Sequence, residues 1–282
     1  MPIDIPPENE TAAGHAAPPA PTLPILPILP TLPALALLMA APFGPPDAGA
    51  LEQALAQADP AGRWRARAVD GALRLEGAGG ALLLGASGGA ELPARVAARS
   101  LWLQPGEAAG IAEAQRASLW LRALPGAQAD STGRRRLALA MAVLVAQLVA
   151  VRPVLAVLNA DRGLLFPARL VPALLAPLAA GEVPLQLFVA IACHGVRAGA
   201  ISLASEGLQA LVGHELEVCE APGSLAEVAA LVEQVARYLL AAGPVIGAGD
   251  TLAPAGSGAP WRAAWQDRAV LRLLPPPGVQ QR

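Results

Sequence analysis

LASEGLQALVGHELEVCEAPGSLAEVAALVEQVARYLLAAGPVIGAGDT, from Leu203 to Thr251, is the stretch whose residue order most clearly specifies a fold. Ser224 with Glu227 three residues later is the signature of a capping box at a helix start. Gly243, followed by proline, is a typical helix stop. We therefore predict an amphipathic helix over 224–242. Its apolar stripe is formed by Leu225, Val228, Leu231, Val232, Val235 and Leu239.

Working outward, short apolar runs indicate strands, several of them too close in sequence to be joined by crossover helices. Such strands must pair antiparallel. We therefore expect an α+β fold, with an antiparallel or mixed sheet packed against helices. The predicted strands are 35–41, 64–69, 72–75, 81–84, 154–158, 185–192, 200–204, 215–218 and 269–274. Further helices are predicted from Asp47, over 107–124 and, irregularly, over 167–180, and an Ala/Leu-rich helix at about 134–151 is expected to be largely buried.

Proline marks the ends of the expected domain. The prolines at every third position in residues 1–33 suit polyproline II, which has three residues per turn. This segment would be a docking tail or stiff spacer, or a disordered extension, which we prefer. The α+β domain is expected over 34–274, with a possible division into halves near 125–133. Residues 275–282 form a second tail.

Neither the start of the chain nor its most apolar run predicts membrane insertion. Asp4, Glu8 and Glu10 make the start acidic, whereas a secretory signal starts with basic residues. The run over 137–151 is shorter than the about 20 residues that a membrane span needs. We therefore expect a cytoplasmic protein, with a membrane-associated one as a less favoured alternative.

Composition excludes several classes of function. Net charge is −2 and the pI is about 6.0, so the basic footprint of a nucleic-acid-binding domain is missing. All 20 basic residues are Arg. Without Lys there can be no Schiff base, no lysine of a phosphate-binding loop and no Ser–Lys dyad. The one dense basic run, 134–136, is expected to be a solvated helix start.

Cysteine and histidine do not predict a metal site. Cys193, His194, His214 and Cys219 have the composition of a zinc set. Neighbouring residues on a strand point to opposite faces, however, so the first two could not share one ion. We expect no metal and no cofactor, and interpret the cysteines as two buried thiols in a reduced compartment.

Four residues are weak candidates for chemistry. Glu215 and Glu217 share one face of a strand, and paired carboxylates can divide acid and base roles. His214 lies beside them and could act as a base, and Asp250 ends a glycine-rich loop. Each also has a structural interpretation, as a solvated strand face, a turn residue or a tight loop. Ser87 lies in a Gly-rich context like a nucleophile elbow, but Pro93 interrupts the helix that should follow.

The same stretch resembles a known family. The pattern Gly207-Leu208, Gly213, Glu215-Leu216-Glu217, a helix containing Tyr238, and Gly249-Asp250-Thr251 is similar to the C-terminal signature of a bacterial family, domain of unknown function 4261. Ser205 and Val212 stand where that family has Thr and Phe. The resemblance extends by element order over about 34–252. It implies the family's fold and a bacterial cytoplasmic setting, and no activity.

The sequence therefore favours a non-catalytic module that binds another protein, in an immunity-type or adaptor role. The alternative is a small-molecule-binding protein or hydrolase-like enzyme that uses a Glu/His/Asp cleft.

Overall fold

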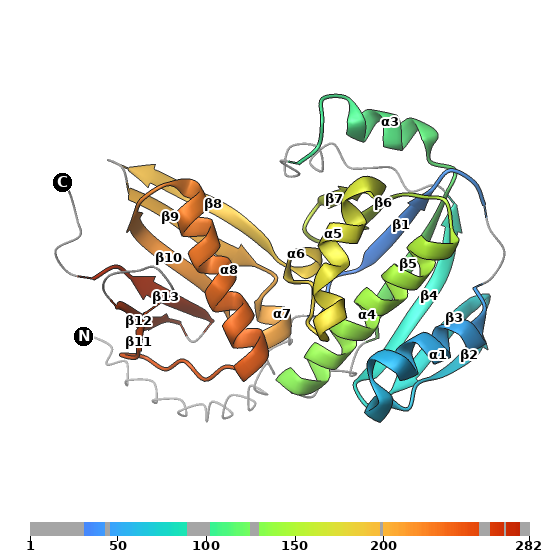
Figure 1. Cartoon of the computed structure of the whole chain (residues 1–282), viewed down its shortest axis with the longest axis horizontal. Helices are drawn as coiled ribbons and strands as arrows, with labels where there is room; N and C mark the ends of the chain where they lie inside the picture. Colours follow the sequence, from blue (N-terminus) through green and yellow to red (C-terminus); the bar gives the residue numbers. More distant parts are fainter. Residues whose placement is uncertain are drawn as a thin grey trace, which may run out of the picture.

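The computed structural model describes residues 31–42, 46–88, 102–124, 130–197, 200–253, 260–267 and 269–276. It shows two sheets, each covered by helices, side by side (Figure 1). The α+β class is thus confirmed, with two sheets in the described residues where the sequence predicted one. The two terminal tails lie almost entirely outside these residues.

The first sheet is antiparallel and has the order β2-β3-β4-β5-β1-β6-β7. The internal strand β1 has every residue buried, as expected of an uncharged run of Leu, Ala and Met. The outer strand β7 is one edge of the sheet. The strands are β1 (Leu35–Met39), β2 (Arg65–Val69), β3 (Ala72–Gly77), β4 (Gly80–Gly88), β5 (Ala117–Ala123), β6 (Val154–Asn159) and β7 (Leu164–Pro167).

Helix α4 (Ser131–Val151) is the predicted Ala/Leu-rich helix, and most of its apolar residues are buried. It contacts α1 (Ala48–Ala58) in one half and α7 (Gln209–Val212) in the other. Arg134, expected to be solvated, is only 7% exposed, because its Nε donates to the Leu211 carbonyl at the end of α7. Within the described ranges, no helix has the length and apolar character needed to cross a membrane.

The second sheet has the order β11-β12-β13-β10-β9-β8, and only the β10–β13 pair is parallel. Helix α8 (Leu225–Ala242) packs on β9 and β10 and begins with the predicted capping box at Ser224. Strand β8 is one edge of this sheet, and β11 is the other. The strands are β8 (Ala190–Arg197), β9 (Ala200–Glu206), β10 (Glu215–Pro222), β11 (Thr251–Leu252), β12 (Trp261–Gln266) and β13 (Val270–Leu274).

Two local predictions were wrong. The predicted helix 107–124 is a short helix, α3 (Glu107–Ala114), followed by the internal strand β5. Buried Ala117, Leu119 and Leu121 repeat every second residue, which suits a strand. The predicted strand 185–192 begins as a helical turn, α6 (Leu185–Phe188), and only then enters β8. Strands β7 and β12 were not predicted.

Candidate functional site

Glu215, a candidate acid or base, holds a turn together. Its carboxylate accepts hydrogen bonds from the Ser205 hydroxyl at 2.5 Å and from the backbone N–H groups of Gly207 and Leu208 at 2.7 and 3.0 Å. The Ser205 hydroxyl oxygen in turn accepts from the N–H of Leu216. The carboxylate therefore ties the start of β10 to the turn between β9 and α7.

Glu217 and Asp250 also have structural partners. Glu217 forms an ion pair of 2.6 Å with Arg272 on the parallel neighbour β13. The Asp250 carboxylate accepts from the N–H of Gly247 at 2.7 Å, closing the glycine-rich loop. Among the described residues, no hydrogen bond or ion pair joins any two of Glu215, Glu217, His214 and Asp250. The structure therefore does not assemble these four into one catalytic cluster.

His214 is buried, with 3% of its surface exposed. Its ring meets the Trp265 ring edge-on at 4.8 Å, and its Nε2 has no hydrogen-bond partner. Burial lowers the pKa of the imidazole below its ordinary value of 6.5. The folded state therefore favours a neutral His214 that packs against β12.

Acidification is expected to destabilise the protein through His214. Below pH 6.5 the unfolded chain protonates this histidine while the folded one resists, so the unfolded state binds more protons. This contribution is complete above pH 6.5 and is lost as the pH falls toward the lower folded pKa. Urea unfolding at pH 7.5 and 5.5 should show that the free energy of unfolding falls less between these pH values in His214→Phe than in the wild type. An equal drop would contradict this role.

The described residues also show no cluster of metal-ligating side chains. No group of three or more His, Cys, Asp or Glu in the described part of the chain is placed to hold an ion. The expectation of two buried thiols was wrong: Cys193 is an exposed free thiol on the edge strand β8, and Cys219 is a half-buried free thiol on β10.

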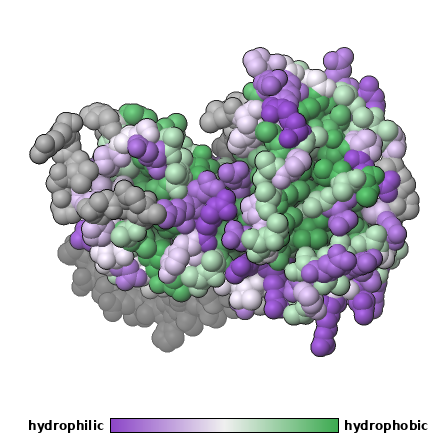
Figure 2. Space-filling model, in the orientation of Figure 1, coloured by the Kyte–Doolittle hydropathy of each residue, from purple (hydrophilic) through white to green (hydrophobic). Residues whose placement is uncertain are grey.

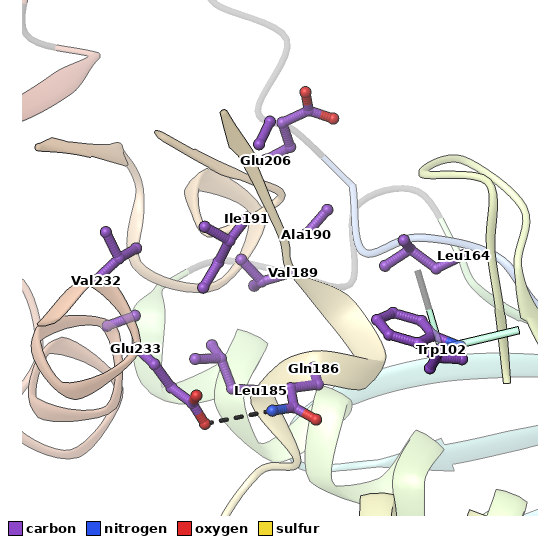
Figure 3. Close-up of a pocket in the computed structure, with 12 residues that line it drawn as sticks. Trp102, Leu164, Leu185, Gln186, Val189, Ala190, Ile191, Glu206, Val232 and Glu233 are labelled. Atoms are coloured by element: carbon purple, nitrogen blue, oxygen red, sulfur yellow. Dashed lines mark hydrogen bonds between the residues drawn. The ribbon is translucent and has the colours of Figure 1, made fainter. Parts of the chain in front are cut away.

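The strongest candidate site is a cleft of about 420 Å³ between the two halves, within the range of ligand pockets. We call it the interlobe cleft. One wall holds Trp102 and Leu164 from the first half, and the opposite wall holds Val232 and Glu233 of α8 (Figure 3). The rest of the lining comes from residues 185–186 of α6, Val189, residues 190–192 of β8, Glu206 of β9 and Ala236 of α8. Two edge strands, β7 and β8, thus contribute to the same cleft.

Trp102 is fixed in its wall by several contacts. Its ring stacks on Phe166 with centroids 4.9 Å apart, and its Nε1 donates to the Leu165 carbonyl at 2.6 Å. Arg169 donates to the Trp102 carbonyl at 3.0 Å and forms two bonds to Glu107. The hydrogen bond from Arg169 lowers the pKa of the Glu107 carboxyl below its ordinary 4.5, so the contact between Glu107 and Arg169 also persists in mildly acidic solution.

The polar groups on the α8 side of the cleft are already paired. Glu233 accepts from Arg237 at 2.7 Å, and Gln186 donates to the same carboxylate at 3.5 Å. Arg237 also approaches Glu182. Figure 2 shows hydrophilic residues gathered at the junction of the two halves, with apolar surface on either side. The cleft thus offers apolar walls beside a largely neutralised polar rim.

Sequence reasoning did not find the interlobe cleft. Trp102 lies 62 residues from Leu164 and 130 from Val232 in the chain, and only the packing of two sheets brings them together. In the structure, the cleft is marked by exposed apolar side chains. Trp102 and Ile191 are large apolar residues that are each 37% exposed.

Fold and site together define an α+β protein of two sheets with an apolar cleft between them. A family model, Domain of unknown function (DUF4261), matches residues 204–279. The expected family resemblance is thereby confirmed for this part of the chain, which includes β10, α8 and the Glu215 turn. Trp102, Leu164 and residues 185–192 of the cleft lie outside the match. No curated protein and no solved structure was found to be similar.

Proposed function

We propose that this is a non-catalytic, bacterial cytosolic module that binds an extended apolar segment of another protein in the interlobe cleft. The observation that carries the proposal is the open edge of β8 beside exposed apolar side chains. No described strand pairs with the outer side of β8. An adaptor or immunity-type role would use such a surface.

The β8 edge gives a partner segment both backbone and side-chain contacts. Unpaired N–H and C=O groups of an edge strand can bind an extended peptide, and neighbouring pockets select its side chains. Ile191 provides an apolar contact on this strand, and Trp102 faces the cleft from the other half. Aromatic anchors of this kind commonly dominate binding energy.

The charge pairing in the rim favours an apolar partner over a charged one. Because Glu233 is paired with Arg237, a cationic ligand would have to compete for an occupied carboxylate. An apolar segment only displaces water from the walls, which is favourable.

A small-molecule-binding protein is the second candidate, because the cleft volume also fits a compact ligand. A hydrolase using Glu215, Glu217, His214 and Asp250 has less support, since none of these residues lines the cleft. The two binding hypotheses differ in the length of ligand that the cleft should prefer.

Selection from a displayed library of random 12-residue peptides tests the proposal. The wild-type chain should enrich apolar sequences whose synthetic peptides bind in fluorescence anisotropy. Ile191→Arg, which places a charge in the cleft, should weaken binding at least about tenfold, equal to about 1.4 kcal/mol.

Val196→Arg is the matched control, because Val196 is on the same strand and 65% exposed but does not line the cleft. Its affinity should equal that of the wild type. Failure to enrich any peptide, or equal binding by the two variants, would refute the proposal.

A further inference from the structure

The residues that lead into the described chain repeat one triplet pattern, Thr or Ile followed by Leu-Pro. Residues 22–33 read Thr-Leu-Pro, Ile-Leu-Pro, Ile-Leu-Pro, Thr-Leu-Pro, without a charged residue. At three residues per turn, the leucines of a polyproline II helix share one edge. These leucines are Leu23, Leu26, Leu29 and Leu32.

The last triplet shows which edge is buried. Leu32 is 3% exposed. The next residues are anchored at the β6–β7 turn, where the Ala34 N–H donates to the Asp161 carboxylate and the Ala34 carbonyl accepts from the Ala160 N–H. In a polyproline II helix the three earlier leucines would continue the edge whose final member, Leu32, is packed into the core.

The described chain starts close to the interlobe cleft. Leu35 pairs with Asn159, and Asn159 pairs with Leu164, a residue of the cleft wall. Two strand spacings, roughly 10 Å, thus separate Leu35 from that wall. The Asn159 side chain also donates to the carbonyl of Leu187 in α6, which forms another part of the cleft. Each triplet spans about 9 Å, so the preceding residues are long enough to reach it.

The chemistry of the triplets also selects a binding mode. In an extended strand, N–H groups of successive residues point alternately to the two sides. Proline at every third position therefore removes N–H groups on both sides, whichever side would pair with β8. Polyproline II segments instead dock by side chains on aromatic-lined grooves. Trp102 supplies an aromatic ring at this cleft, held in place by stacking on the buried Phe166.

We propose that residues 22–30 bind the interlobe cleft of their own chain and compete there with a partner segment. This inference rests on the proposed function, because it assigns a regulator to the same site. A tethered segment acts at an effective concentration of about 1 mM. Against an intrinsic Kd of about 0.1 mM, it would weaken partner binding about tenfold.

The test uses the full chain with Leu26→Asp and Leu29→Asp, which place charges on the leucine edge. A labelled peptide of residues 21–33, extended by two arginines for solubility, is titrated by anisotropy. It should bind this variant about tenfold more tightly than the wild type, and adding Ile191→Arg should abolish the binding. Ala12→Asp with Ala17→Asp, which adds the same charge outside the triplets, should behave as the wild type.

Other results would overturn the inference. Equal affinity for the wild type and the Leu26/Leu29 variant, or binding that survives Ile191→Arg, would show that the segment does not occupy the cleft. A wild-type dimer that becomes monomeric in this variant would place the segment in a second copy. If library-selected peptides bind the cleft and the 21–33 peptide does not, the inference fails while the proposed function stands.

Discussion

Replacing Glu215 by alanine is expected to lower the free energy of unfolding by about 3 kcal/mol. The change removes the acceptor for the Ser205 hydroxyl and for the N–H groups of Gly207 and Leu208. Hydrogen bonds to a charged group are the stronger ones, and half-buried donors left without an acceptor carry a desolvation cost. Urea unfolding at pH 7.5 measures the loss.

Glu217→Ala is the matched control on the same face of β10. Its ion pair with Arg272 is partly exposed, so the loss should be under about 1 kcal/mol. If Glu215→Ala unfolded like the wild type, the carboxylate would not be the clamp of the β9–α7 turn. Comparing the two glutamates distinguishes the loss of the hydrogen bonds made by Glu215 from the general effect of removing a carboxylate from this strand.

Gly207→Ala is expected to cost about 3 kcal/mol or more. Gly207 has φ +111°, a conformation that residues with a side chain rarely adopt. A Cβ there would lie 2.6 Å from the Phe188 carbonyl oxygen, a backbone atom that cannot turn aside. Backbone strain and overpacking each contribute about 1–3 kcal/mol. Thermal and urea unfolding should both show the loss.

Gly110→Ala controls for the general effect of adding a methyl group. Gly110 lies inside helix α3 with nothing within 4 Å of the added Cβ. Alanine there should stabilise the protein by about 0.5–1 kcal/mol. Wild-type stability of Gly207→Ala would show that the turn can relax, contrary to the geometry of Phe188.

Both positions link the family-matched part of the chain to the interlobe cleft. Gly207 follows Glu206, which lines the cleft, and contacts the backbone just before Val189, which also lines it. The Glu215 carboxylate holds this turn through its hydrogen bonds to Ser205, Gly207 and Leu208. Glu215 and Gly207 therefore shape the cleft without lining it.

Local chemistry was predictable where one short segment determines it. The capping box of Ser224 and Glu227 and the helix start at Asp47 both formed as expected, because their hydrogen bonds lie within a few residues. The buried character of α4 followed from its nearly all-apolar circumference.

Contacts between residues far apart in the chain were harder to predict from the sequence. Strand β5 was predicted as helix because its Ala and Leu residues suit either structure, and its pairing with β1 and β4 decides the outcome. Glu215 was identified as noteworthy, but its role depends on Ser205 and Gly207 across a turn. The interlobe cleft combines residues from both halves, so no local pattern marks it.

Indole N–H chemical shifts on addition of a library-selected peptide test the central claim most directly. The chain has five tryptophans, and of these Trp102 lines the cleft. The claim predicts that the Trp102 signal shifts in a saturable way together with methyl signals of Leu164, Ile191 and Val232, while Trp265 stays unchanged. Shifts at Trp265, or at Leu225 and Tyr238 on the exposed side of α8, without a change at Trp102 would contradict it.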